Sequence, residues 1–124
     1  MRAPSAQAFA EGWIAAWNTH DLDAILSHYA DEIEFSSPVA TALVGEGRIR
    51  GIADLRAYWT QGLSLNAGLH FDLLDVLCGE GFLTLLYDNE RKQRVAETFE
   101  FDDAGRVTRA CACYRAAAQR RNDD

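Results

Sequence analysis

Apolar residues recur at helical spacing in the first half of the chain. Phe9, Trp13 and Trp17 lie four residues apart, so a helix over residues 5–18 would place them on one face. A second helix is expected to begin after Asp21, whose carboxylate can cap the first turn. The apolar face of that second helix would hold Leu22, Ile25, Leu26 and Tyr29.

Breaks in the pattern follow these two helices. Residues 33–35 alternate like a short strand, and Pro38 should end that strand because proline has no N–H for a sheet ladder. Glycines at positions 45, 47 and 51 predict a loop, in which residues 48–50 are extended. A third helix is expected over residues 52–63, with its apolar positions again at helical spacing.

From about residue 69 apolar and polar residues alternate, which is the period of a β-strand. Glycine, aspartate and asparagine interrupt the alternation at regular intervals and predict turns. The expected strands span residues 69–78, 82–88, 93–101 and 106–115. Helices followed by an antiparallel meander are an α+β arrangement.

We therefore expect a single domain over residues 1–124, with its core in residues 5–116 and a polar tail at 117–124. Its architecture would be a cone-shaped curved sheet, antiparallel or mixed, with three helices covering the concave face. A curved sheet does not fill its own hollow, so a cavity is expected there. Aromatic side chains that could line this cavity, or equally fill the core, are Trp13, Trp17, Phe35, Tyr58, Trp59 and Phe99.

The net charge of the chain limits the kinds of partner that it is expected to bind. The chain has 12 basic and 19 acidic residues, a net charge of −7, which argues against nucleic-acid phosphate as a partner. No apolar run is long enough to cross a membrane. The three cysteines form no even disulfide set, and the first residues lack the apolar segment of a signal peptide. These features predict a cytoplasmic protein.

Glu97 is the most unusual residue of the alternating region. It shares one face of its expected strand with Val95, Phe99 and Phe101, so it should point into the hollow among apolar side chains. Burial of a carboxyl group raises its pKa, because the charged form loses its hydration. Such a group can donate a hydrogen bond when protonated or act as a general base when ionised. Alternatively, Glu97 pairs with a buried arginine or tyrosine and only organises the core.

The last expected strand separates two kinds of residue. Ala110, Ala112 and Tyr114 share one face, where the small side chain of Ala112 leaves room for a ligand and the Tyr114 hydroxyl could orient it. The opposite, outer face carries Arg109, Cys111, Cys113 and Arg115. The two cysteines share one side of the strand, but no third or fourth ligand accompanies them, so we predict no metal site.

Residues 13–38, read as helix, corner, helix and proline-terminated strand, resemble the opening of SnoaL-like and ketosteroid-isomerase-like domains of the nuclear-transport-factor-2-like superfamily. The resemblance extends over about residues 5–116. It implies a cystatin-like α+β cone with an internal pocket. It also implies a homodimer, because the outer sheet face in this superfamily usually packs against a second copy.

The resemblance to the isomerases also covers individual positions. Residues 95–102 resemble the strand that carries a protonated aspartate of the oxyanion hole, with Glu97 at the place of that aspartate. The general base, an aspartate before a proline, is replaced by Ser37, and the oxyanion tyrosine is replaced by Trp13. Steroid isomerisation is therefore not expected. His28 and His70 could supply a base but are expected at the surface or rim.

Three functions remain open from the sequence. The protein could be a SnoaL-like isomerase, cyclase, dehydratase or hydrolase for an apolar carbonyl compound, with Glu97 as acid, base or oxyanion donor and Ser37, Tyr58 and Tyr114 as polar groups that orient the substrate. It could bind a small apolar ligand without turnover, or serve as a dimerisation or interaction module. No dinucleotide or phosphate-loop motif is present, so no cofactor is predicted.

Overall fold

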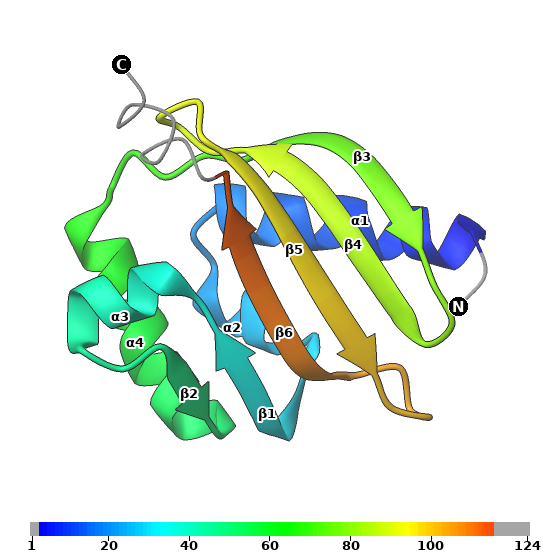
Figure 1. Ribbon diagram of the computed structural model, residues 1–124, viewed down its shortest axis with the longest axis horizontal. Helices are drawn as coiled ribbons and strands as arrows, with labels where there is room; N and C mark the ends of the chain where they lie inside the picture. The colour runs from blue at the N-terminus through cyan, green and yellow to red at the C-terminus, as the bar shows by residue number, and fades with distance from the viewer. Residues whose placement is uncertain (1–2, 116–124) are drawn as a thin grey trace.

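The computed structural model describes residues 3–115 and folds them into one six-stranded sheet with four helices (Figure 1). The helices are α1 (Ala3–Asn18), α2 (Leu22–Leu26), α3 (Pro38–Val44) and α4 (Ile52–Leu65). The strands are β1 (Tyr29–Ser36), β2 (Arg48–Arg50), β3 (Asp72–Cys78), β4 (Phe82–Asp88), β5 (Arg94–Phe101) and β6 (Val107–Tyr114).

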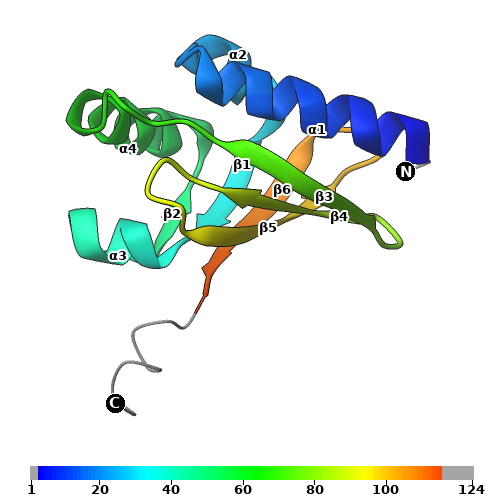
Figure 2. The ribbon, with the colours of Figure 1, turned by 90° about the horizontal axis from the view of Figure 1, so that it is seen from above.

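The strand order in the sheet is β2-β1-β6-β5-β4-β3. Strand β1 pairs parallel with β6, and all other neighbouring strands are antiparallel. Helix α1 packs along β3 and α4 packs along β1. Figure 2 shows α1 across one face of the sheet, while no described helix crosses the opposite face of β3, β4 and β5. The predicted α+β fold with a curved mixed sheet is confirmed.

The corner between α1 and α2 follows the sequence signals. The Asp21 carboxylate caps α2 by accepting a hydrogen bond from the Ala24 N–H at 3.1 Å. Helix α2 ends at Leu26, however, and Tyr29 begins β1 rather than lying on the helix. The prediction for Tyr29 was wrong because pairing with Val107 of β6 fixes this residue in the sheet.

Helix α3 lies where the sequence predicted only a loop. Its first turn has a clear cap, since the Ser37 hydroxyl accepts from the Val39 N–H and Pro38 occupies the first helical position. Gly45 ends the helix in the left-handed conformation, at φ 78°. The expected extended segment at 48–50 is β2, which pairs with β1.

The predicted boundaries of the strands differ from the structure mainly at β3. Its pairing with β4 begins at Asp72, and the preceding residues lie outside the sheet. Side chains hold them instead: Asn18 exchanges two hydrogen bonds with the Phe71 backbone, at 2.7 and 2.9 Å. His20 contacts the Leu69 carbonyl oxygen at 2.9 Å. Helix α1 thereby fixes the segment that leads from α4 into the sheet.

Between residues 3 and 115, none of the helices is long and apolar enough to cross a membrane.

Candidate functional site

A cavity of about 290 Å³ lies between the inner face of the sheet and the helices. Its walls are mainly aromatic, and polar side chains from the β4–β5 turn and from the end of α4 form its rim. Residues that line the cavity include Trp13, Trp17, Phe35, Ser37, Tyr58, Trp59, Phe71, Tyr87, Asn89, Glu90, Glu97, Ala112 and Tyr114.

Glu97 lies on the inner face of β5 and is 3% exposed. The Tyr87 hydroxyl donates a hydrogen bond to its Oε1 at 2.9 Å. No arginine, lysine or histidine within residues 3–115 forms an ion pair with it. Burial without a cation raises the pKa of Glu97 to about 7, although the hydrogen bond from Tyr87 acts in the opposite direction. The carboxyl group therefore populates both protonation states near neutral pH.

Four tyrosines surround this carboxyl group. Burial raises the pKa of Tyr29, Tyr58, Tyr87 and Tyr114, and the negative charge of Glu97 raises each of them further. For Tyr58 the pKa reaches about 12. All four hydroxyls consequently stay protonated at neutral pH and can donate hydrogen bonds.

The indole N–H groups of the two α1 tryptophans differ. Trp13 donates to the Tyr29 hydroxyl at 2.9 Å, so its single donor is engaged within the protein. Trp17 Nε1 is buried and has no hydrogen-bond partner among the described residues. Trp13 cannot donate to a ligand without losing its bond to Tyr29.

Ser37 lines the cavity, but its hydroxyl already forms a hydrogen bond with the backbone. It accepts a hydrogen bond from the Val39 N–H at 3.1 Å and so caps α3.

We expect Ser37→Ala to lower the free energy of unfolding by about 1 kcal/mol, because an N-cap acceptor is lost. Ser37→Asn should change it far less, because asparagine also caps helices. Chemical denaturation of the two variants measures this difference. No loss for Ser37→Ala would show that the cap contributes nothing to stability, and equal losses for both variants would show that the loss does not come from the missing acceptor.

The predicted site residues lie largely together. The three residues proposed for chemistry, Glu97, Ser37 and Tyr114, all line the cavity. So do six of those proposed for ligand contact: Trp13, Trp17, Phe35, Tyr58, Trp59 and Ala112. Phe99 does not line it. Its ring is fully buried beside Phe9 and Trp13, with ring centroids 5.1 and 5.3 Å away.

Tyr87 and Phe71 are lining residues that the sequence analysis missed. The alternation of β4 places Leu83, Leu85 and Tyr87 on the buried face, and this signal could have identified Tyr87. Phe71 has no such signal because it precedes β3. Its ring stacks on Trp13 with the centroids 5.7 Å apart, and the Asn18 side chain holds its backbone by two hydrogen bonds.

The rim of the cavity is built by hydrogen bonds between loops. Glu90, in the β4–β5 turn, accepts from the Asn66 side chain at 2.9 Å and from the His70 N–H at 3.3 Å. The Asn89 side chain accepts from the backbone N–H groups of Arg91 and Gln93 and so shapes the turn. The β4–β5 turn is thereby joined to the segment that follows α4.

The histidines do not line the cavity. The ring of His28 packs edge-on against Phe9, and burial lowers its pKa. His70 is exposed and lies 3.1 Å from Asp72. In the part of the chain that the structure describes, no cluster of three or more His, Cys, Asp or Glu side chains could hold a metal ion.

Comparison with known families identifies a SnoaL-like domain over residues 10–120. The chain belongs to the SnoaL-like family. A SnoaL-like protein of unknown function from Burkholderia thailandensis E264 is 41% identical, with a TM-score of 0.90 over 93% of this chain and 98% of that chain. A comparison with curated proteins finds no match.

More distant structures share the SnoaL-like fold. AclR, a hydroxylase candidate from Streptomyces galilaeus, is 18% identical, with a TM-score of 0.70 over 99% of both chains. TerC, co-crystallised with polyporic acid, is 15% identical, with a TM-score of 0.73 over 90% of this chain and 92% of that chain. At these identities the likeness establishes the fold alone, so the activity of this SnoaL-like domain has to be argued from its cavity.

Proposed function

We propose that this SnoaL-like domain is an acid–base enzyme for an apolar carbonyl compound, of the isomerase, cyclase, dehydratase or hydrolase class. Glu97 is its proton donor and acceptor. One observation carries the proposal: a carboxyl group that forms no ion pair with the described residues faces an aromatic cavity, and burial raises its pKa to about 7. General acid–base catalysis is most effective when the pKa of the catalytic group lies near the working pH.

The surroundings of Glu97 support different roles for its two carboxyl oxygen atoms. The Tyr87 hydroxyl holds Oε1, which fixes the orientation of the carboxyl group. The other oxygen, Oε2, has no hydrogen bond to the described residues. In the protonated form Oε2–H donates to a substrate carbonyl, and in the ionised form Oε2 removes a proton from the carbon beside it.

Two further hydroxyl groups complete the proposed site. Tyr58 and Tyr114 line the cavity, and neither hydroxyl forms a hydrogen bond with another residue in the described range 3–115. Their raised pKa values keep them protonated, so they can donate to the oxygen on which negative charge develops. Donors placed in a water-poor aromatic cavity stabilise such charge more than water does.

The walls of the cavity favour an apolar substrate body. Trp13, Trp17, Trp59 and Phe71 line the cavity, and its volume of about 290 Å³ lies just below the roughly 300–1,000 Å³ typical of ligand sites. Among structures with this fold, one is described as a hydroxylase candidate and another was crystallised with polyporic acid. These descriptions of two proteins with the same fold support a small-molecule role for the cavity of this chain.

Steroid isomerisation itself is not part of the proposal. The isomerase resemblance places a base at the position of Ser37, whose hydroxyl caps α3 here. It places an oxyanion tyrosine at the position of Trp13, whose N–H is bound to Tyr29. Both positions serve the structure of the protein, which leaves Glu97 and the hydroxyls of Tyr58 and Tyr114, unbonded among the described residues, to act on a substrate.

A thermal-shift screen tests the proposal. The wild type and Glu97→Gln are heated with a varied set of apolar ketones, enones and lactones, and Glu80→Gln in the exposed β3–β4 turn is the matched control. A ligand at about a hundred times its dissociation constant stabilises the fold by roughly 2.7 kcal/mol, or several degrees. We expect hits whose shift depends on Glu97 but not on Glu80, and turnover of those compounds that Glu97→Gln lowers by roughly 10²–10⁴-fold.

Two results would count against the enzyme proposal. Hits that bind the wild type and Glu97→Gln equally would indicate a cavity that binds ligands without using the carboxyl group. If no compound stabilises the protein, and if it binds a partner protein through a hydrophobic part of its surface, the interaction-module alternative would be favoured.

A further inference from the structure

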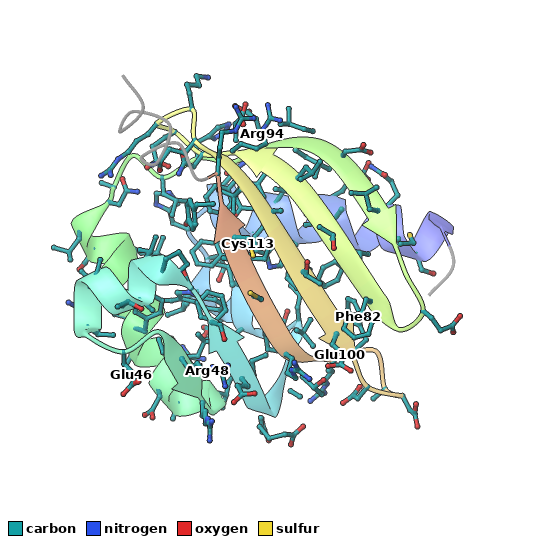
Figure 3. The ribbon with its side chains drawn as sticks, in the orientation of Figure 1. Glu46, Arg48, Phe82, Arg94, Glu100 and Cys113 are labelled. Carbon is teal, nitrogen blue, oxygen red and sulfur yellow. The ribbon has the colours of Figure 1, made fainter. Side chains whose placement is uncertain are left out.

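Ala112 of β6 lies directly beside the carboxyl group of the proposed site. It is paired with Glu97 of β5, so the two side chains are neighbours on one face of the sheet. Cys113, the next residue along β6, is exposed on the outer face (Figure 3), and the alternation of the strand turns Ala112 toward the cavity. On the β6 side of Glu97 the cavity wall is therefore a single methyl group.

A second alanine on the same strand shows why the space over Ala112 stays open. Ala110 also faces inward, but it is paired with Phe35 of β1 and Phe99 of β5 and does not line the cavity. Beside Ala112 the described sheet has no β1 partner, because β1 ends at Ser36. Aromatic residues thus flank Ala110 on both sides along the sheet, whereas no strand continues on the β1 side of Ala112.

The volume of the cavity limits what can fill it. An apolar protein cavity of about 150 Å³ accommodates one benzene molecule. By that measure the volume of about 290 Å³ holds roughly two six-membered rings. A four-ring compound could place only part of its skeleton inside, and the rest would stay at the mouth in contact with solvent.

The charges that line the cavity favour a neutral substrate. Among the described lining residues Arg91 alone carries a positive charge, and its Nε lies 3.9 Å from the Glu90 carboxylate. The Arg91 side chain is largely exposed in the β4–β5 turn, so it is a rim residue. Ionised Glu97 would repel an anion. The hydroxyls of Tyr58 and Tyr114 are neutral donors that suit a carbonyl oxygen.

On the basis of the proposed function, on which this assignment rests, we infer that Ala112 is the specificity-determining residue of the site and that the substrate is a neutral carbonyl compound of one or two rings. The carbonyl end lies over the Ala112 methyl group, beside Glu97 and near Tyr114, which is on the same face of β6. The rings fill the aromatic part of the cavity. A third ring finds no space inside and adds no affinity.

An NMR titration of the folded full chain with ketones of increasing size tests both parts. The probes are cyclohex-2-enone with one ring, 2-tetralone with two and androst-4-ene-3,17-dione with four. The signals followed are the ¹³C-labelled methyl groups of alanine, and the Ala112 signal is assigned by its absence from Ala112→Val. The control is Ala96, which is paired with Cys113 and therefore lies on the outer face of β5.

We expect 2-tetralone to bind at least roughly tenfold more tightly than cyclohex-2-enone, because its second ring buries more apolar surface. The four-ring ketone should bind no more tightly than 2-tetralone. Binding should shift the Ala112 methyl signal and leave the Ala96 signal in place. Ala112→Val and Ala112→Leu should weaken 2-tetralone binding in that order, by roughly tenfold or more for leucine, and Ala96→Val should leave it unchanged.

Three results would overturn the assignment. They are tighter binding of the four-ring ketone than of 2-tetralone, wild-type affinity for 2-tetralone in Ala112→Leu, and failure of 2-tetralone to bind the wild type. Circular dichroism shows whether each variant is folded. If Ala112→Leu does not fold, Ala112→Val decides, because valine is smaller and suits a β-strand.

Glu97→Gln separates this assignment from the enzyme proposal. Exchange of the protons beside the 2-tetralone carbonyl for deuterium measures proton transfer in both proteins. Equal exchange in the wild type and Glu97→Gln, with 2-tetralone bound over Ala112, would sink the enzyme proposal and leave the size limit standing. Glu97-dependent exchange in a four-ring ketone that binds more tightly than 2-tetralone would do the reverse.

Discussion

Glu97→Gln is expected to become more stable than the wild type as the pH rises. Between about pH 5 and pH 8.5 its free energy of unfolding should gain roughly 2–3 kcal/mol relative to the wild type. The pKa of Glu97 is raised from 4.5 to about 7 in the fold, chiefly by burial. Below the pKa that Glu97 has in the unfolded chain, the carboxyl group is protonated in both the folded and the unfolded state. The wild type therefore loses no stability through ionisation of Glu97 at such pH values.

As the pH rises, the unfolded chain releases the Glu97 proton first and the folded chain retains it until about pH 7. The folded state then binds more protons than the unfolded state, and stability falls with pH through this window. Glutamine keeps an acceptor for the Tyr87 hydroxyl and cannot ionise. The variant therefore escapes this loss.

Urea unfolding of both proteins across this pH range measures the difference, which corresponds to roughly 10 °C in Tm. Glu80→Gln should follow the wild-type pH profile, because that side chain is exposed in the β3–β4 turn. If the unfolding free energies of Glu97→Gln and the wild type differ by the same amount at every pH, ionisation of Glu97 does not cause the difference.

Phe99→Ala is expected to have the other large effect, a loss of about 3–5 kcal/mol of unfolding free energy. The Phe99 ring is fully buried and packs against Phe9, Trp13 and Phe101. It does not line the cavity, so its removal creates a new void in a packed region. The surrounding aromatic rings come from α1 and β5, so they cannot close that void unless α1 shifts toward the sheet.

Phe82→Ala is the matched control for this prediction. That ring is 42% exposed on the outer face, so its removal should cost less than about 1 kcal/mol. Denaturation of both variants by urea gives the comparison. A cost for Phe99→Ala as small as that for Phe82→Ala would show that this region is loosely packed.

The fold was largely predictable because its longest elements have strong periods. Four-residue spacing identified α1, and alternation placed Glu97 and Ala112 on the inner face of the sheet. Helix α3 was missed although Ser37 and Pro38 carry its capping signal. The helix has only seven residues, and the glycines that follow it favoured a loop.

The site was less predictable, because it depends on how the elements meet. Alternation puts Glu97 and Phe99 on the same face of β5, but it does not indicate where α1 covers that face. Phe9 of α1 packs on Phe99 and closes that end, while Glu97 faces the open cavity. The Tyr87–Glu97 hydrogen bond likewise depends on the register of β4 against β5, which sets Leu85 opposite Glu97.

Catalysis by Glu97 as proposed requires that its carboxyl group titrates near neutral pH inside the cavity. A ¹³C NMR titration of glutamate carboxyl carbons tests this, with the Glu97 signal assigned by its absence from Glu97→Gln. We expect a titration midpoint at about pH 7. A midpoint near the ordinary glutamate value of about 4.3 would contradict it, because a group ionised throughout the neutral range could not exchange protons with a substrate as proposed.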